Sequence, residues 1–347
     1  MTCNRHTRQA ANRRSTIPTY KQSLIMVKVT IAGGTGTVAR EIFEALAESQ
    51  RHEVVVLSRS STPPEPPLPA GVSIQVVDYD DRPSLEQALA GTHTLLSFLQ
   101  LFTDAGKTAQ ENLIDAAVAA GVRRIAPSEW SSVSFTDMSF YQNKQAHRDQ
   151  LERLAQTHDF EYSLIQPGMF LEYLAAPHKT TAYLDPLMTV FDFSGKRAMV
   201  VEGREDVPIT FTSITDVGQA VLAMVDLPGE VPWPKTAGIC GNKLSARAIL
   251  DMGERIFGQP MTVTVLQTAD LEAGELKSPW GLQLSHKAVA AEQLQELLKQ
   301  VAIGTLLSFS KGAWDSSDEV NRLLPEGFQF TGAEDFLTKV WGAGRQE

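Results

Sequence analysis

A glycine-rich segment directly follows the first predicted strand. The sequence GGTGTVAR (33–40) places Gly33, Gly36 and Ala39 at three-residue intervals. Gly33 permits a tight turn, Gly36 lets a pyrophosphate approach the backbone, and the small Ala39 lets the next helix pack against the strand. The first N–H groups of that helix are unpaired and attract an anion. The segment therefore predicts a dinucleotide site, whose candidate residues are Gly33, Gly34, Thr35, Gly36, Thr37 and Val38.

The end of the second predicted strand indicates which dinucleotide would bind. In the sequence LSRSS, Arg59 stands where an NAD site carries an acidic residue, and the next carboxylate along the chain is Glu65. A guanidinium forms charge-assisted hydrogen bonds with a ribose 2′-phosphate. We therefore predict NADP (NADPH) as the cofactor. The alternative is that Arg59 is only a solvated loop residue.

These residues need a doubly wound parallel sheet to position them. From Met26 on, short apolar runs alternate with helical patterns, which is typical of a Rossmann-type α/β fold. Five prolines between the second and third strands predict an exposed connector. The predicted strands are 27–32, 53–58, 73–77, 92–99, 123–126 and 162–166, and the predicted helices are 37–49, 83–90, 105–120 and 139–158.

Two lobes are expected after an N-terminal extension. We assign 1–25 to an unstructured extension, 26–175 to the NADP-binding Rossmann domain and 176–347 to a smaller mixed α/β lobe that binds substrate. The segment 207–227 is expected to pack back on the first domain. The extension holds five basic residues and no acidic one, so an organelle presequence is the alternative interpretation.

Composition excludes several classes of protein. The 347 residues are 43% hydrophobic and 21% charged, which argues against a fibrous or disordered chain, and no apolar run is long enough to span a bilayer. Beyond residue 25 the net charge is −15 (26 basic against 41 acidic residues), which disfavours nucleic-acid binding. Two cysteines exclude a disulfide framework and favour a reducing, cytoplasmic location.

Several further segments carry a resemblance to a known family. They are IAGGTGTVAR, the arginine in VLSRS, ENLIDAAVAAGVRRIAPSEW (111–130), and Lys144 with Arg148 in YQNKQAHRDQLERL. With these features the chain resembles the NmrA-like branch of atypical short-chain dehydrogenase/reductases, and within it the isoflavone reductase and phenylcoumaran benzylic ether reductase group. The resemblance implies an NADPH-dependent reductase in which Lys144 is the general acid/base and Arg148 touches the nicotinamide cofactor.

The spacing of Lys144 and Arg148 is compatible with these roles. Four residues advance a helix by about 400°, so both side chains lie on one face about 40° apart. Repulsion from Arg148 and partial burial would both lower the pKa of Lys144. By composition alone the helix is a charged surface helix. Tyr141 precedes Lys144 by three residues, whereas ordinary short-chain dehydrogenases have a tyrosine four residues before the lysine. We therefore treat Tyr141 as a candidate for the substrate pocket.

The carboxyl ends of the predicted strands supply an aromatic and apolar lining for the substrate. A flat, uncharged or phenolic molecule fits such a surface. The sequence has neither a metal-ligand cluster nor a nucleophile triad. The predicted substrate-pocket residues are Phe98, Gln100, Trp130, Tyr141, Met169, Phe170 and Tyr173.

The expected function is reduction of an aromatic or polyketide-like secondary metabolite by NADPH, with no nucleic acid or membrane as a partner. Two alternatives stay open. One is an NmrA-like regulatory protein that senses dinucleotides without catalysis. The other is an isomerase or dehydratase on the same fold. The sequence leaves open whether the protein is a monomer or a homodimer.

Overall fold

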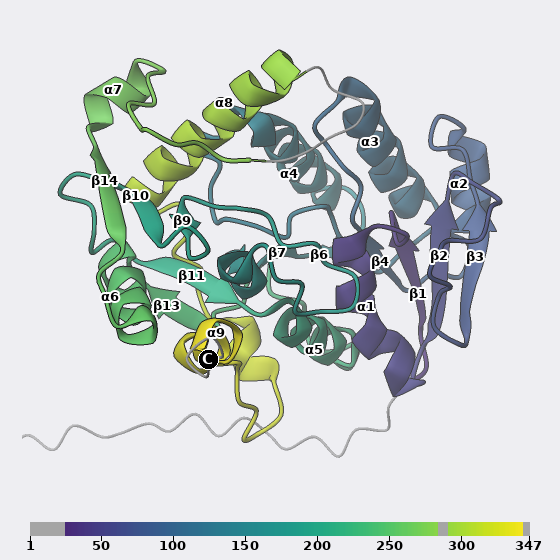
Figure 1. Ribbon diagram of the computed structural model, residues 1–347. Helices are drawn as coiled ribbons and strands as arrows, with labels where there is room; N and C mark the ends of the chain where they lie inside the picture. The colour runs from purple at the N-terminus through teal and green to yellow at the C-terminus, as the bar shows by residue number, and fades with distance from the viewer. Residues whose placement is uncertain (1–24, 284–290, 343–347) are drawn as a thin grey trace, which may run out of the picture.

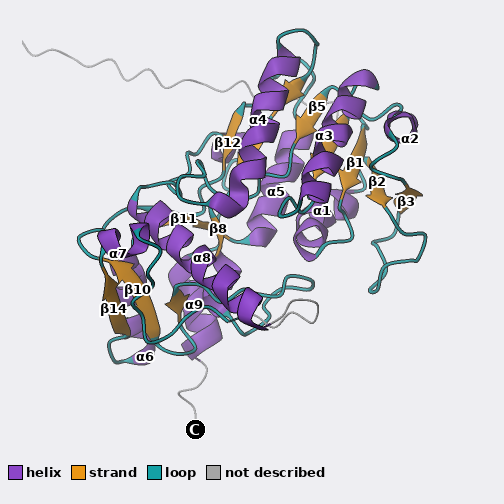
Figure 2. Ribbon diagram, turned by 90° about the horizontal axis from the view of Figure 1, so that it is seen from above, coloured by secondary structure: helices purple, strands orange, loops and turns teal. Residues whose placement is uncertain are grey.

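A computed structural model describes residues 25–283 and 291–342. The predicted N-terminal extension lies outside these residues, except for Ile25. Figure 2 shows two lobes, one around the large sheet with α1 to α5 and one around β10, β14 and α6 to α9.

The first lobe contains a six-stranded sheet with the order β3-β2-β1-β4-β5-β6, in which every pairing is parallel (Figure 1). This arrangement confirms the predicted Rossmann-type fold. The strand order reverses between β1 and β4, and in such sheets ligands bind beyond the carboxyl ends of the strands at that reversal. The strands are β1 (Lys28–Ala32), β2 (Glu53–Ser58), β3 (Val72–Val76), β4 (Thr94–Ser97), β5 (Arg124–Ala126) and β6 (Glu161–Tyr162).

Helices cover both faces of this sheet. One face packs against α1 (Thr37–Ser49) and α5 (Ile214–Val225), whose apolar residues share a cluster with Val29, Ile31 and Val56. The other face packs against α2 (Arg82–Ala88), α3 (Asp104–Ala119) and α4 (Gln142–Ala155). Within the segment 207–227, α5 therefore packs on the first lobe. A Cβ at Gly218 would lie 3.0 Å from the Ile42 carbonyl oxygen, so this glycine allows α5 to approach α1 closely.

The second lobe has its own apolar core, which gathers residues of two small sheets and four helices. These sheets have the orders β14-β10-β9 and β13-β11-β8, whereas a third small sheet, β12-β7, contributes Ile165 and Ala237 to the apolar cluster of the first lobe. The strands are β7 (Leu164–Gln166), β8 (Met169–Phe170), β9 (Phe191–Asp192), β10 (Arg197–Val201), β11 (Ile209–Thr212), β12 (Thr236–Gly238), β13 (Asn242–Leu244) and β14 (Thr262–Leu266). The helices are α6 (Ala246–Phe257), α7 (Thr268–Glu272), α8 (Ala291–Ser310) and α9 (Ala333–Trp341), with 3₁₀ turns at Ser139–Tyr141, Leu171–Ala175 and Val320–Leu323.

One predicted strand differs from the structure. The run 162–166 divides at Ser163, so that β6 closes the large sheet and β7 pairs with β12 instead. Ser163 is fully buried, and its hydroxyl donates to the Pro234 carbonyl oxygen at 2.5 Å. Leu164 N–H donates to the Lys235 carbonyl oxygen, which turns the chain away from β5. After the division, β8 pairs with β11, so Met169 packs in the core of the second lobe while Phe170 packs in the core of the first.

Candidate active site

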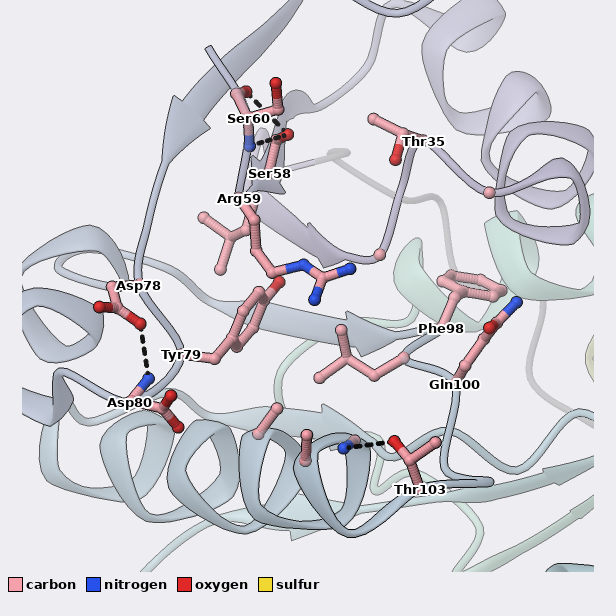
Figure 3. A pocket seen from close by; sticks show the side chains of 17 residues that line it. Thr35, Ser58, Arg59, Ser60, Asp78, Tyr79, Asp80, Phe98, Gln100 and Thr103 are labelled. Carbon is pink, nitrogen blue, oxygen red and sulfur yellow. Dashed lines mark hydrogen bonds between the residues drawn. The ribbon is translucent and has the colours of Figure 1, made fainter. Parts of the chain in front are cut away.

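A cavity of about 810 Å³ lies beyond the carboxyl ends of β1 to β4, at the point where the strand order reverses (Figure 3). We call it the switch-point cavity. Its walls come from the glycine turn, the ends of β2, β3 and β4, and the N-terminal half of α3. The lining residues are Gly33, Thr35, Gly36, Leu57, Ser58, Arg59, Ser60, Asp78, Tyr79, Asp80, Phe98, Leu99, Gln100, Thr103, Ala105, Gly106 and Ala109.

The glycine turn leaves room for a ligand at the backbone. Gly33 has a φ of +72°, and a Cβ there would lie 2.9 Å from the Phe98 carbonyl carbon and oxygen, so a larger residue does not fit. Gly36 N–H donates to the Gly33 carbonyl oxygen at 3.0 Å, which closes the turn. Gly36 is also the N-cap of α1 and provides no capping side chain. The first N–H groups of α1 thus remain available to an anion, as the sequence predicts.

Arg59 occupies the opposite wall. It is exposed, and Figure 3 shows its guanidinium extending into the cavity. The turn that carries it is held by Ser58, whose hydroxyl donates to the Ser60 carbonyl oxygen at 2.9 Å and accepts from Ser60 N–H at 3.1 Å. Among the described residues, no carboxylate forms an ion pair with Arg59, so its charge is available to a ligand. Together with the open turn at Gly33 and Gly36, this arrangement fits a phosphorylated dinucleotide.

Arg40, by contrast, has a structural role. Its guanidinium donates to the carbonyl oxygens of Pro66 and Pro67, both at 2.6 Å, and lies 4.3 Å from the centre of the Tyr183 ring. It thereby ties the proline-rich connector to α1 next to the turn that bears Arg59. Because Arg40 is only 3% exposed, it is not the residue that meets the ligand.

The other end of the cavity is formed by β4 and α3. Phe98 stacks on Trp130 with ring centres 4.2 Å apart, and Trp130 Nε1 donates to the Ser97 carbonyl oxygen at 2.7 Å. Trp130 has a φ of +46°, which is uncommon for a bulky residue and orients the indole behind Phe98. Thr103 caps α3 by accepting from Gly106 N–H at 3.1 Å. Phe98 thus presents a flat aromatic surface near Gln100, and Trp130 supports it from behind.

Lys144 lies behind the backbone that follows β5. Its Nζ donates to the carbonyl oxygens of Ser128 at 2.7 Å and Glu129 at 2.5 Å, and it lies 4.9 Å from the centre of the Tyr141 ring. Burial lowers the pKa of Lys144 to about 8; Arg148 acts in the same direction and Glu129 opposes it. The expectation of a lowered pKa agrees with this result. Lys144 does not belong to the wall of the switch-point cavity formed by the described residues.

Arg148, on α4, forms an ion pair with Glu129, which lies on the loop after β5 that also binds Lys144. It forms a two-point ion pair with Glu129, with Nε–Oε1 at 3.1 Å and Nη2–Oε2 at 2.5 Å. Its Nη1 donates to the Val133 carbonyl oxygen, and its guanidinium lies 4.0 Å from the centre of the Phe135 ring. Lys144 and Arg148 do share one face of α4, and both hold the loop 128–133. A contact between Arg148 and a cofactor stays a prediction.

The structure brings together only part of the predicted site. Gly33, Thr35, Gly36, Arg59, Phe98 and Gln100 line the switch-point cavity, whereas Gly34, Thr37 and Val38 belong to the same turn or to the first turn of α1 without lining it. Trp130, Tyr141, Met169, Phe170 and Tyr173 pack in or against the apolar cores at the boundary between the lobes. Tyr141 touches three aromatic rings there, those of Phe102, Phe135 and Phe140.

Sequence reasoning missed several residues of the cavity, among them Tyr79 and Thr103. A signal existed for these two. Thr103 precedes the acidic start of α3 in TDAG, which is a helix-capping pattern. Tyr79 comes three residues after the end of β3 in VVDYDD, and the residues that follow a parallel strand lie at the ligand edge of the sheet.

A family model settles what kind of chain builds this cavity. Residues 26–306 match the model of the NmrA-like family. The chain belongs to this family. It is 29% identical to oxidoreductase BOA1 of Botryotinia fuckeliana (strain B05.10), over 87% of the chain and 95% of that protein. It is 28% identical to oxidoreductase swnN of Metarhizium robertsii, over 91% of the chain and 98% of that protein.

Solved structures share the fold of this NmrA-like chain. An NADPH-dependent quinone oxidoreductase of Escherichia coli superposes with a TM-score of 0.62 and 19% identity, covering 90% of this chain and 99% of that one. The leucoanthocyanidin reductase–NADPH complex of Vitis vinifera superposes with a TM-score of 0.61 and 17% identity, covering 90% and 98%. Within the described residues, no helix is long and apolar enough to cross a membrane, and no cluster of His, Cys, Asp and Glu side chains is suited to hold a metal ion.

Proposed function

We propose that this NmrA-like protein is an NADPH-dependent reductase that acts on an aromatic or polyketide-like secondary metabolite. The observation that carries the proposal is the continuity of the switch-point cavity, which joins the open glycine turn, Arg59 and the Phe98–Gln100 segment in one space. The names of the relatives, oxidoreductases over nearly the whole chain, support the same class of reaction. When bound, NADPH would supply a hydride from C4 of its nicotinamide.

Different residues of the cavity would bind different parts of the cofactor. Gly33 and Gly36 leave space for the pyrophosphate next to the free N–H groups of α1. Arg59 meets the 2′-phosphate, because its guanidinium extends into the cavity and no described carboxylate neutralises it. Phe98, supported by Trp130, offers a flat surface to the reacting end of the cofactor and to an aromatic substrate.

Lys144 is our candidate for the general acid/base. A lysine with a pKa of about 8 is mostly protonated near neutral pH and releases its proton far more readily than an exposed lysine. Two of its three N–H groups are used by the Ser128 and Glu129 carbonyl oxygens, which leaves one to donate. We propose that it protonates the oxygen of the reduced group, directly or through water. A cytoplasmic location is also part of the proposal, supported by the low cysteine content.

Cofactor selectivity tests the binding half of the proposal. We expect the wild-type protein to bind NADPH more tightly than NADH in calorimetric titrations. Arg59→Met should weaken NADPH binding by roughly 10- to 100-fold and leave NADH binding unchanged, since it removes a hydrogen-bonded charge pair. Arg153→Met, on the exposed side of α4, is the matched control. Equal affinity of the wild-type protein for both dinucleotides would refute the assignment.

Consumption of NADPH tests the reaction. With a panel of quinones, aromatic enones and aromatic ketones, a reductase oxidises one NADPH for each substrate molecule reduced. A regulatory protein binds NADPH and consumes none with any of these compounds. An isomerase or dehydratase converts substrate while NADPH stays constant.

A further inference from the structure

Tyr79 holds a fixed position in the wall of the switch-point cavity. It lies between β3 and α2, is 5% exposed, and its ring packs in the same cluster as Leu57 and Leu85. Its carbonyl oxygen accepts from Asn112 Nδ2 at 2.9 Å, which ties the backbone to α3. Ring packing and the backbone hydrogen bond to Asn112 therefore fix the position of Tyr79.

The hydroxyl of Tyr79 has no hydrogen-bond partner among the described residues, although it is buried. In Figure 3 it points into the cavity, close to the guanidinium of Arg59. Burial raises the pKa of Tyr79 above its ordinary value, and the nearby Gly33 backbone and the Arg59 charge only partly offset this, so the group remains a protonated donor. A buried O–H without a partner is destabilising, so its presence in a native protein calls for a functional explanation, such as a bound ion or water or a role in catalysis.

We propose that the Tyr79 hydroxyl is a specificity-determining ligand of the cofactor, donating a hydrogen bond to an oxygen of the 2′-phosphate beside Arg59. This inference rests on the proposed function. The 2′-phosphate is favoured over the pyrophosphate because Tyr79 and Arg59 both line the cavity, after β3 and β2, whereas the free N–H groups of α1 begin at Thr37, which does not line it. A neutral O–H beside a guanidinium supplies a second donor without adding like-charge repulsion.

The test removes only the hydroxyl. For Tyr79→Phe we expect NADPH binding to weaken about tenfold or more in calorimetric titrations, while NADH binding stays within about twofold. Tyr162→Phe is the matched control, because its hydroxyl donates to Glu152, away from the cavity, at 2.6 Å. Unchanged NADPH affinity in Tyr79→Phe would overturn the inference, and so would an equal loss for NADPH and NADH, which indicates a pyrophosphate contact.

Thermal unfolding without ligand provides a second, independent readout. Deleting an unpartnered hydroxyl should leave Tm unchanged or raise it. A lower Tm, or failure of Tyr79→Phe to fold, would show that the hydroxyl has a structural partner and would also overturn the inference. The proposed function fails in a different way, namely when the wild-type protein shows no preference for NADPH. Normal wild-type selectivity with an unaffected Tyr79→Phe variant therefore refutes the role of Tyr79 alone.

Discussion

The ionisation of Lys144 leads to a pH dependence of stability that is unusual for a lysine. The pKa of Lys144 is about 8 in the folded protein against an ordinary value of 10.5. Burial is the main cause, because it disfavours the ammonium form. Since the folded state releases this proton before the unfolded chain does, the unfolded state binds more protons between these two pH values. The free energy of unfolding contributed by this group therefore rises with pH through the folded pKa.

The size of the effect follows from the two pKa values. Near pH 7 both states are protonated, so Lys144 contributes almost no pH dependence. Near pH 9 the folded protein has lost most of this proton and the unfolded chain has kept it, which adds roughly 1 kcal/mol to the free energy of unfolding. The free energy of unfolding continues to rise with pH until the unfolded chain also loses this proton, and the total gain is about 3 kcal/mol.

Comparison of the wild-type protein with Lys144→Met isolates this contribution. Urea unfolding at about pH 7 and about pH 9 should show the wild-type protein gaining roughly 1 kcal/mol relative to the variant, because other groups titrate alike in both. Lys107→Met is the matched control, since Lys107 is half-exposed on α3 and pairs with Glu111 at 3.8 Å. Parallel pH dependences in the wild-type protein and Lys144→Met would refute the argument that burial controls the pKa of this lysine.

The same variant tests catalysis. Lys144→Met should abolish turnover while NADPH still binds, and the turnover of the wild-type protein should fall as the pH rises past about 8.

Two further predictions concern stability and are checked by denaturant unfolding. Arg124 is 2% exposed, pairs with Glu161 at 3.0 Å and donates to three carbonyl oxygens, so Arg124→Met should lower the free energy of unfolding by about 3–5 kcal/mol. A loss below about 1 kcal/mol would contradict this structural role. Gly168→Ala should cost about 3 kcal/mol or more, since φ is +73° and a Cβ would lie 2.3 Å from the Thr210 carbonyl oxygen. Gly91→Ala, with φ of +72° but no atom within 4 Å, should cost only about 1 kcal/mol, and equal losses in the two variants would refute the steric argument.

The first lobe was predictable because its elements carry strong local patterns. Continuous apolar runs identified β1 and β2, and the helical spacing of apolar residues between strands identified α1 and α3. The division of 162–166 into β6 and β7 was not predictable, because it depends on Ser163 and Leu164 bonding to the carbonyl oxygens of Pro234 and Lys235, about 70 residues further along the chain. Local periodicity contains no information on such distant partners.

The site residues also divide into those whose position depends on local sequence and those whose position depends on distant contacts. Gly33, Gly36 and Arg59 were found from sequence because backbone geometry at a βα turn and the end of the next strand determines their position. Tyr141 was assigned to the substrate pocket from its place three residues before Lys144, and Met169 and Tyr173 because they follow a predicted strand. The structure packs all three in or against the core of the second lobe, and their contact with a substrate stays a prediction.

The position of Lys144 constrains how a proton would reach the substrate. Its ammonium is held by the carbonyl oxygens of Ser128 and Glu129, the two residues directly before Trp130, whose indole supports Phe98. The lysine therefore stabilises the loop that shapes the reacting end of the cavity and also carries the candidate proton. Its Nζ does not line the cavity among the described residues, so if Lys144 is the proton donor, we expect the proton to pass beside this backbone, through a water or with a small displacement of the loop. A lysine held more loosely would be more exposed, and its pKa would return toward its ordinary value. The contacts that keep Lys144 out of the cavity are thus the ones that keep it buried and give it a pKa suited to proton transfer.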